Sequence, residues 1–127
     1  MRWIEARTAY LIHELQLGEH GGGIGVRDAG RLEAALAQPR MVLDYEPDSD
    51  LARLAASYAH GIAKGHPFID GNKRTAFVVA ETFLNANGVI LHADDAACIE
   101  KTLALAAGTL SEDEFADWLR ANTALKE

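Results

Sequence analysis

AFVVAETFL, residues 76–84, is apolar almost all round and carries a single charge, Glu81. A helix that is apolar on every side is buried within its domain and does not lie on the surface. Asn87-Gly88, shortly after it, is a typical stop signal. The sequence therefore predicts a helix that begins near Asn72 and lies at the centre of the fold.

On either side of this stretch, apolar residues recur at helical spacing. Asp50 is placed to cap a third helix that ends at Gly65, and Ser111 with Glu114 forms a capping box for the last one. The predicted buried faces are those of a first helix (Ile4, Thr8, Leu11, Ile12, Leu15), a short second one that Pro39 ends (Leu32, Ala35, Leu36), a third (Leu51, Leu54, Ala55, Tyr58, Ala59, Ile62), a fifth that Gly108 ends (Ala96, Ile99, Leu103, Ala107) and a sixth (Phe115, Trp118, Leu119).

The segments between these helices are predicted to be loops. Stacked glycines break the chain at 18–25, and RMVLDYEPDSD at 40–50 mixes a short apolar run with acids. Residues 88–92 are predicted as a short extended link. No internal repeat or domain boundary is present, so we expect one all-α domain over 1–127, a compact bundle of about six helices around a central buried helix.

Composition narrows the function classes. Of the 127 residues, 49% are apolar, enough for a real core, and the formal net charge of −7 argues against direct nucleic-acid binding, which needs a basic face. No apolar run reaches the length of a membrane span, and the N-terminus lacks a signal-peptide pattern. A single cysteine, Cys98, excludes an internal disulfide and favours a cytoplasmic protein.

The stretch HPFIDG, residues 66–71, joins the third and fourth predicted helices. His66 precedes Pro67, and a residue before proline is kept out of helical geometry, so we expect His66 on the loop. Phe68 is apolar and is predicted to anchor the loop in the core. Asp70 is predicted to cap the fourth helix, and Gly71 lets the backbone approach a ligand closely.

Lys73 and Arg74 stand in the first turn of the fourth helix, where cations are unfavourable. The helix N-terminus is itself positive, so each charge should cost roughly 0.3–1 kcal/mol. The N–H groups of residues 71–74 are predicted to point outward and to form an anion site, for which phosphate is the usual occupant. A bound polyphosphate would make both charges favourable, and a local rule broken in this way indicates function.

The neighbouring side chains meet the remaining requirements of phosphoryl transfer. Asp70 can hold Mg²⁺ jointly with phosphate oxygens, and His66 can accept a proton from an attacking hydroxyl. Asn72 either donates hydrogen bonds to an oxygen or holds the loop. Each residue alone has a structural explanation, but together, at fixed offsets, they indicate a functional site.

HPFIDGNKR, residues 66–74, resembles the signature of the Doc (death-on-curing) toxins of the Fic/Doc superfamily, H-x-F-x-D/N-A/G-N-K-R, at every defined position. Residues 21–39 and 57–77 also resemble Doc sequences. The resemblance implies the helical Fic/Doc fold and a toxin of a type II toxin-antitoxin module. It also implies a kinase-like activity that transfers the γ-phosphate of ATP to a threonine of elongation factor Tu and stops translation.

The same resemblance implies roles for the motif residues, with ATP and Mg²⁺ as cofactors. His66 would be the catalytic base and Asp70 the Mg²⁺ ligand. The phosphate cradle would consist of the loop backbone with Gly71, Asn72, Lys73 and Arg74. A separate antitoxin chain is the implied partner, since Thr123 to Glu127 has the spacing of the superfamily's inhibitory helix but the chain ends at the glutamate.

Two alternative functions remain open. Fic adenylyl transferases carry H-P-F-x-D/E-G-N-G-R-x-x-R, and here Lys73 replaces the second glycine and Phe77 the second arginine, so transfer of AMP is disfavoured. A catalytically silent member would bind only nucleotide or antitoxin. Residues 41–43 with Tyr45 either contact a substrate or partner or tuck their side chains inward.

No second site is expected elsewhere in the sequence. The glycine run 21–23 lacks the strand-then-helix context of a nucleotide loop, so we do not expect it to contact ATP. Arg27-Asp28 resembles a helix start. No metal-binding arrangement is predicted for the remaining histidines and the cysteine, which are His13, His20, His60, His92 and Cys98.

Overall fold

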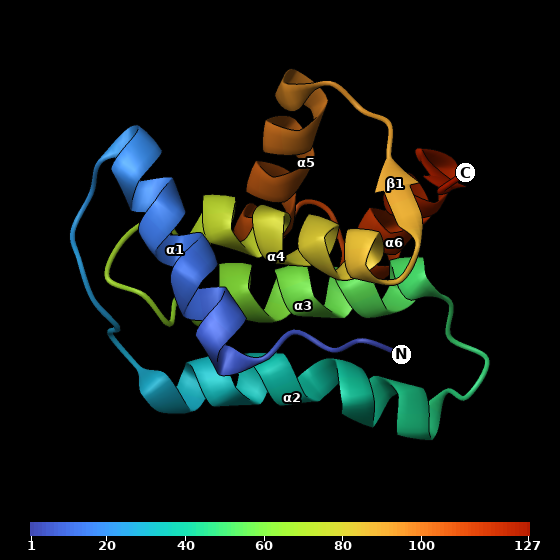
Figure 1. The fold of residues 1–127 in the computed structure, drawn as a ribbon, viewed down its shortest axis with the longest axis horizontal. Helices are drawn as coiled ribbons and strands as arrows, with labels where there is room; N and C mark the ends of the chain where they lie inside the picture. The colour runs from blue at the N-terminus through green and yellow to red at the C-terminus, as the bar shows by residue number, and fades with distance from the viewer.

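The computed structural model describes all residues from Met1 to Glu127 and confirms the all-α bundle (Figure 1). The apolar stretch forms the buried part of a helix over Asn72–Ala86, as predicted. The elements in chain order are α1 (Ala6–His20), α2 (Ala29–Tyr45), α3 (Leu51–Gly65), α4 (Asn72–Ala86), β1 (Val89–Leu91), α5 (Asp95–Ala107), α6 (Glu112–Ala121) and β2 (Thr123–Leu125).

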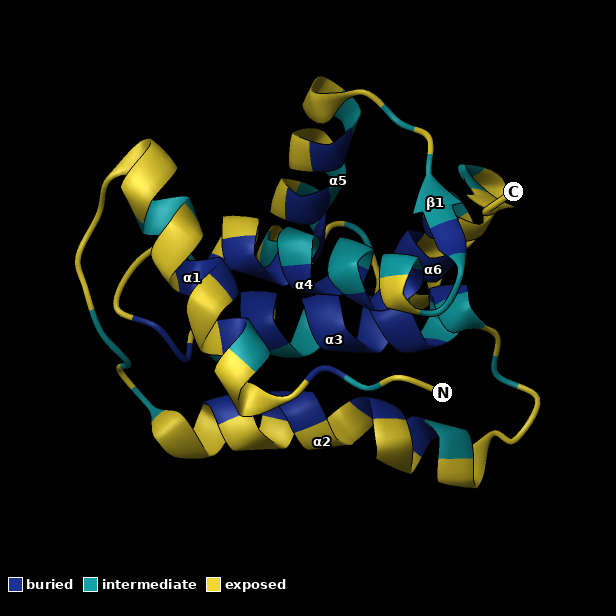
Figure 2. Cartoon of the chain, viewed as in Figure 1, coloured by how far each residue is buried: buried dark blue, intermediate teal, exposed yellow.

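Two helices, α3 and α4, share the centre that the sequence assigned to α4 alone. They lie side by side, with α2 beneath α3 and α5 standing across α4 in Figure 1. The burial colours of Figure 2 show that α3 is almost entirely enclosed. Gly61 permits the close contact of α3 with α2, because a Cβ there would lie 2.9 Å from the Cβ of Ala35. The core is therefore a layered packing of α2, α3 and α4.

Side-chain caps begin four of the six helices. Asp50 accepts a hydrogen bond from Arg53 N at 2.9 Å, and Ser111 and Glu114 form both bonds of the capping box, so these two predictions are confirmed. Gly108 ends α5 in a left-handed conformation, as expected. The further caps are Asp28 on α2 and Asp94 on α5.

The predicted end of the second helix at Pro39 is wrong, and so is the predicted loop over 40–45. α2 continues to Tyr45 with Pro39 inside it. A proline in a helix interior costs about 3 kcal/mol, because it removes one hydrogen bond and crowds the preceding turn. Burial of Val42 and partial burial of Leu43 against the core offset this cost. Tyr45 is 86% exposed, so it does not tuck inward.

Two predicted apolar faces are also wrong in part, although Ile4 and Ile12 are buried as predicted. In α1 the buried residues are Ala9, Ile12 and His13, whereas Leu11 and Leu15 are exposed. The helix starts only at Ala6, because Ile4 lies before it and donates its backbone N–H to the Tyr58 hydroxyl at 2.9 Å. In α5 the buried side chains are those of Cys98, Thr102 and Leu105, while Ile99 and Leu103 are exposed.

The predicted extended link at 88–92 is confirmed as β1, but its partner was not predicted. β2 pairs with it antiparallel, with Val89 opposite Leu125 and Leu91 opposite Thr123. The terminal residues with the spacing of an inhibitory helix therefore form a strand. No helix combines the length and apolar character that crossing a bilayer requires.

Candidate functional site

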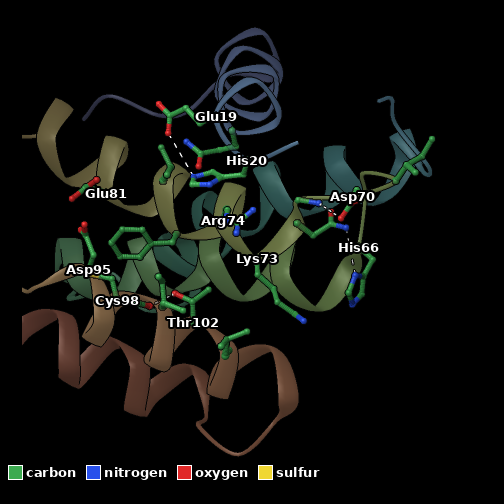
Figure 3. Close-up of a pocket in the computed structure, with 18 residues that line it drawn as sticks. Glu19, His20, His66, Asp70, Lys73, Arg74, Glu81, Asp95, Cys98 and Thr102 are labelled. Atoms are coloured by element: carbon green, nitrogen blue, oxygen red, sulfur yellow. Dashed lines mark hydrogen bonds and ion pairs between the residues drawn. The ribbon is translucent and has the colours of Figure 1, made fainter. Parts of the chain in front are cut away.

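His66 opens the loop between α3 and α4 with a left-handed backbone. Its φ is +48° and its ψ +54°, and it is the only residue other than glycine with a positive φ. Such a conformation costs on the order of 1–3 kcal/mol and persists only where the surroundings impose it. The exposed imidazole lines a groove on the surface of the bundle (Figure 3).

Arg27 is the residue that holds this conformation from outside the loop. Its Nε donates to the His66 carbonyl at 2.9 Å and its Nη2 to the Gly65 carbonyl at 3.2 Å. Arg31 Nη1 donates to the same Gly65 carbonyl at 3.3 Å. These carbonyls lie at the end of α3, where helices lack internal partners and cations are favourable. The two arginines therefore fix the point at which the chain leaves α3.

A second loop, residues 21–28, runs beside residues 66–71 and pairs with them. Val26 and Phe68 form an isolated antiparallel bridge, Ile69 N donates to Gly25 O at 3.1 Å, and Arg27 N donates to Pro67 O at 2.7 Å. Phe68 itself is fully buried. The loop that carries His66 and Asp70 is thus fastened on one side to the core and on the other to a glycine-rich strand-like segment.

Asp70 does not cap α4, contrary to the prediction. Its Oδ1 accepts from Gly71 N at 2.8 Å and its Oδ2 from Gly23 N at 3.3 Å. The glycine run lies directly against it: a Cβ on Gly22, whose φ is +128°, would lie 2.9 Å from Asp70 Oδ2. Gly22 and Gly23 of the run therefore lie against Asp70 and support it, a role that was not predicted.

α4 begins without any side-chain cap. Its N-cap residue is Gly71, with φ +75°, and its first turn contains no acidic residue. The first N–H groups of a helix have no internal partner, so those of Asn72, Lys73 and Arg74 remain available to an anion. Of the four N–H groups predicted to point outward, that of Gly71 donates to Asp70 instead, and Gly71 takes the N-cap position that was assigned to Asp70.

Asn72 is buried and braces the loop. Its Oδ1 accepts from Phe68 N at 2.9 Å, and its Nδ2 donates to Phe68 O at 2.9 Å. The same Nδ2 lies 3.5 Å from His66 Nδ1. Of the two roles left open for Asn72, the contacts are those of a loop brace. The amide group also lies next to the imidazole and is able to orient it.

Lys73 and Arg74 are exposed and form no ion pair, although acidic residues outnumber basic ones in the chain. Both line the groove, a cavity of about 820 Å³ whose other walls come from α1, α4 and α5. Figure 3 shows the two side chains between Asp70 and the middle of the groove. A volume of this size is within the range of small-molecule sites.

The far end of the groove is acidic. Glu81 on α4 and Asp95 on α5 face it, together with Cys98, and Figure 3 shows them at the end opposite His66. Burial raises the pKa of Glu81, and the Asp95 carboxylate raises it further. Burial likewise raises the pKa of the Cys98 thiol, as expected of a cysteine that is not an activated nucleophile. The groove is thus basic at the loop and acidic at its other end.

A metal ion would find one carboxylate at the basic end. No three His, Cys, Asp or Glu side chains come together in a metal-binding cluster. Asp70 stands alone there, next to the uncapped helix terminus. Mg²⁺ typically binds one or two protein carboxylates and completes its coordination with phosphate oxygens and water, so the donor set fits Mg²⁺ that arrives with a phosphorylated ligand.

All but one of the site residues predicted from the sequence line the same groove. His66, Asp70, Gly71, Asn72, Lys73 and Arg74 all line the groove, while Phe68 lies beneath it in the core. Two residues at the loop were missed, Arg27 and the buried His13, whose Nε2 lies 2.8 Å from the Asp70 carbonyl. The apolar face predicted for the first helix contained neither Ala9 nor His13, so no local signal pointed to the burial of His13.

Comparisons with known proteins converge on one family. The model of the Fic/DOC family matches residues 3–84. The chain is 36% identical, over 94% of either chain, to the "Protein kinase doc" of Escherichia phage P1. It is 46% identical, over 58% of either chain, to the "Toxin Doc" of Mycolicibacterium smegmatis.

Proposed function

The chain belongs to the Fic/DOC family, and from that premise and the geometry of the groove we propose that it is a kinase-like toxin. It transfers the γ-phosphate of ATP to a threonine hydroxyl of a translation factor, elongation factor Tu. Translation stops as a result, and the reaction takes place in the cytoplasm. The names of two relatives, a protein kinase and a toxin, support this assignment.

One observation carries the proposal: α4 starts uncapped, with two unpaired cations and an exposed histidine at the same end of one groove. Charges that pair with nothing in the protein are available to a ligand. Phosphoryl transfer requires mainly positioning and charge stabilisation, and a polyphosphate at this helix terminus would receive both. The N–H groups of residues 72–74 would hold phosphate oxygens, and Lys73 and Arg74 would neutralise them.

His66 is proposed as the catalytic base. Its imidazole accepts the proton of the attacking hydroxyl, while Asn72, 3.5 Å from Nδ1, orients the ring. Asp70 holds Mg²⁺, which when bound neutralises charge on the transferred phosphate. The left-handed backbone of His66, fixed by Arg27, keeps the base at the mouth of the groove.

Two residues favour γ-phosphate transfer over transfer of AMP. Lys73 places a long cation where adenylyl transferases of the superfamily have glycine, and this leaves less room at the helix terminus. Phe77 lines the groove where those enzymes have a second arginine, which would clamp the outer phosphates. Both differences change how a triphosphate lies in the groove.

A separate antitoxin chain is proposed to restrain the enzyme. Ile99 is 57% and Leu103 47% exposed on the α5 wall, so the groove offers an apolar surface that the chain itself does not cover. A segment that folds on binding would use such a surface.

Labelled ATP tests the proposal. Purified protein with Mg²⁺ and bacterial lysate is incubated with ATP labelled at the γ or the α phosphate, with His66→Ala as the control. We expect label from γ only, on a band with the mass of elongation factor Tu. The control should lose about 10²- to 10⁴-fold in rate, as removal of a general base does.

Each other result points to a different function. Label from α would identify an adenylyl transferase and overturn the interpretation of Lys73 and Phe77. A γ-labelled band of another mass would keep the kinase and replace its target. Label that persists in His66→Ala would remove His66 as the base, and no label from either ATP on any protein of the lysate would indicate a silent binding protein.

A further inference from the structure

His13 is a buried polar residue that the proposed chemistry does not use. It lies on α1 and is 3% exposed, beside the core residues Ala9 and Ile12. Burial of an imidazole is costly unless its polar atoms are hydrogen-bonded. An apolar residue at this position would serve the packing of α1 equally well, so its contacts must explain the histidine.

All the described contacts of His13 are with the loop that carries the motif. Its ring is stacked on Phe68, with centroids 3.8 Å apart and an interplanar angle of 8°. Its Nε2 lies 2.8 Å from the backbone carbonyl oxygen of Asp70. The ring also lies 3.8 Å from the Cβ position of Gly71. One side chain of α1 therefore reaches three residues of the loop, Phe68, Asp70 and Gly71.

The hydrogen bond fixes which nitrogen carries the proton. A carbonyl oxygen only accepts, so Nε2 is the protonated nitrogen and donates to Asp70. Phenylalanine would provide the same stacked ring without this donor. The stacking explains an aromatic residue at position 13, and the hydrogen bond explains why it is a histidine.

Asp70 is thereby held at three separate atoms. Its carbonyl oxygen accepts from His13, its Oδ1 from Gly71 N and its Oδ2 from Gly23 N. The two carboxylate contacts come from glycine backbone N–H groups, that of Gly71 at the start of α4 and that of Gly23 in the loop 21–28. His13 is the side chain that links Asp70 to α1, and its stacking on Phe68 links the residue to the core.

We propose that His13 is a positioning residue, which sets the orientation of Asp70 toward the metal and phosphate held at the start of α4. This inference rests on the proposed function, because it assumes that Asp70 meets Mg²⁺ with a nucleotide. His13 touches neither the nucleotide nor the reacting atoms. Its effect passes through the Asp70 backbone, and its loss changes the carboxylate position without emptying the phosphate cradle.

The test separates metal-dependent from metal-independent binding. Binding of ADP is measured by calorimetry with Mg²⁺ and, for reference, with EDTA. In His13→Phe, which keeps the stacked ring, we expect the Kd of Mg²⁺-ADP to rise by about 10- to 100-fold, as when partners of metal ligands are removed. The Kd of metal-free ADP should change by less than about threefold, because Lys73, Arg74 and the helix terminus are untouched.

Three further variants separate the hydrogen bond that His13 donates from a general loss of stability. Ile12→Val removes core volume from the same helix and keeps the His13 hydrogen bond and ring stacking, so it should lower the Tm and leave both Kd values unchanged. His13→Gln and His13→Met have similar length and differ in the donor. The glutamine variant should bind Mg²⁺-ADP more tightly than the methionine variant, a comparison that stands even if His13→Phe does not fold.

Equal Mg²⁺-ADP affinity in wild type and His13→Phe, or in the glutamine and methionine variants, would overturn the role of His13 and leave the proposed function intact. An equal loss with and without Mg²⁺ would also overturn it, since the effect would then be general to the loop. Wild-type protein that binds no ADP in either buffer would overturn the nucleotide site and the role of His13 together.

Discussion

The N-termini of α4 and α6 are built in opposite ways. α6 has a complete capping box from Ser111 and Glu114, and its first turn is acidic, with Glu112, Asp113 and Glu114. α4 has no side-chain cap, no acid in its first turn, and two cations instead. At α6, residues of the protein itself bond the first N–H groups and neutralise the partial positive charge of the helix N-terminus. At α4, the N–H groups have no such partners and the positive charge is not neutralised.

Charge pairing around the two termini differs in the same way. Near α6, Arg53 pairs with Glu112 and Glu46, and Arg120 pairs with Asp50 and Asp117. At α4, neither Lys73 nor Arg74 has an ionic partner. Both ends of the bundle are rich in charge, so charge density does not distinguish them. Unpaired charge on an uncapped helix does, and it marks α4 as the terminus that a ligand completes.

Among the changes that test this contrast, Arg74→Ala should have the largest effect. Loss of a cation that stabilises transferred charge should lower kcat by about 10²- to 10³-fold. The free energy of unfolding should instead rise by about 0.3–1 kcal/mol, because a charge unfavourable to the empty helix is removed. Transfer assays and thermal denaturation on the same preparation measure both quantities.

Arg120→Ala is the matched control, since Arg120 is an exposed arginine with ionic partners. Its Nε lies 2.6 Å from Asp50 Oδ2. Its removal should lower the free energy of unfolding by roughly 0.2–1 kcal/mol and leave the transfer rate unchanged. If Arg74→Ala also lowered stability, Arg74 would have a structural role and the contrast between the two termini would fail.

A smaller effect is expected from Ser111→Ala at the satisfied terminus. Removal of an N-cap side chain costs about 1 kcal/mol. Denaturant unfolding should show this loss as a lower midpoint with an unchanged slope. Transfer activity should stay at the wild-type level. A fall in activity of the folded variant would mean that α6 is coupled to the groove, although none of its residues lines it.

How far the sequence predicts the molecule depends on the range of the interaction concerned. Caps act within one turn, so Asp50 and the Ser111–Glu114 box were predicted correctly. The burial of residues 76–84 was likewise predicted correctly from their own apolar character. The motif residues lie within nine positions, so their convergence on one groove followed from the chain itself.

The failures share a dependence on distant partners. Pro39 was expected to end α2, and only the packing of Val42 and Leu43 on the core explains why the helix continues. Ile99 and Leu103 were assigned to the core on periodicity, which does not tell a core face from a groove wall. Arg27 and His13 reach the loop across 39 and 57 residues of sequence, and no local pattern encodes such contacts.

The smallest expected effects concern the pH dependence of stability at two carboxylates. The hydrogen bond from Arg120 lowers the pKa of Asp50, although partial burial opposes it. A lowered folded-state pKa stabilises the protein above the ordinary value near 3.8, and this contribution is lost as the pH falls through the folded-state value. For an exposed pair the effect is at most about 1 kcal/mol. Asp50→Asn keeps the cap acceptor and should flatten the stability curve below about pH 4.

Glu81 in the groove should show the opposite sign. Burial raises its pKa above the ordinary 4.5, so the unfolded chain loses the proton first, and stability falls as the pH rises from 4.5 through the folded-state value. Glu81→Gln should remove this fall and stabilise the protein at neutral pH, while Asp50→Asn destabilises it. Thermal denaturation from pH 3 to 8 compares the two. If both variants changed the stability at neutral pH in the same direction, the Glu81 carboxylate would be stabilised by its surroundings as well as that of Asp50. The contrast between unpaired and paired charges would then not apply to the acidic end of the groove.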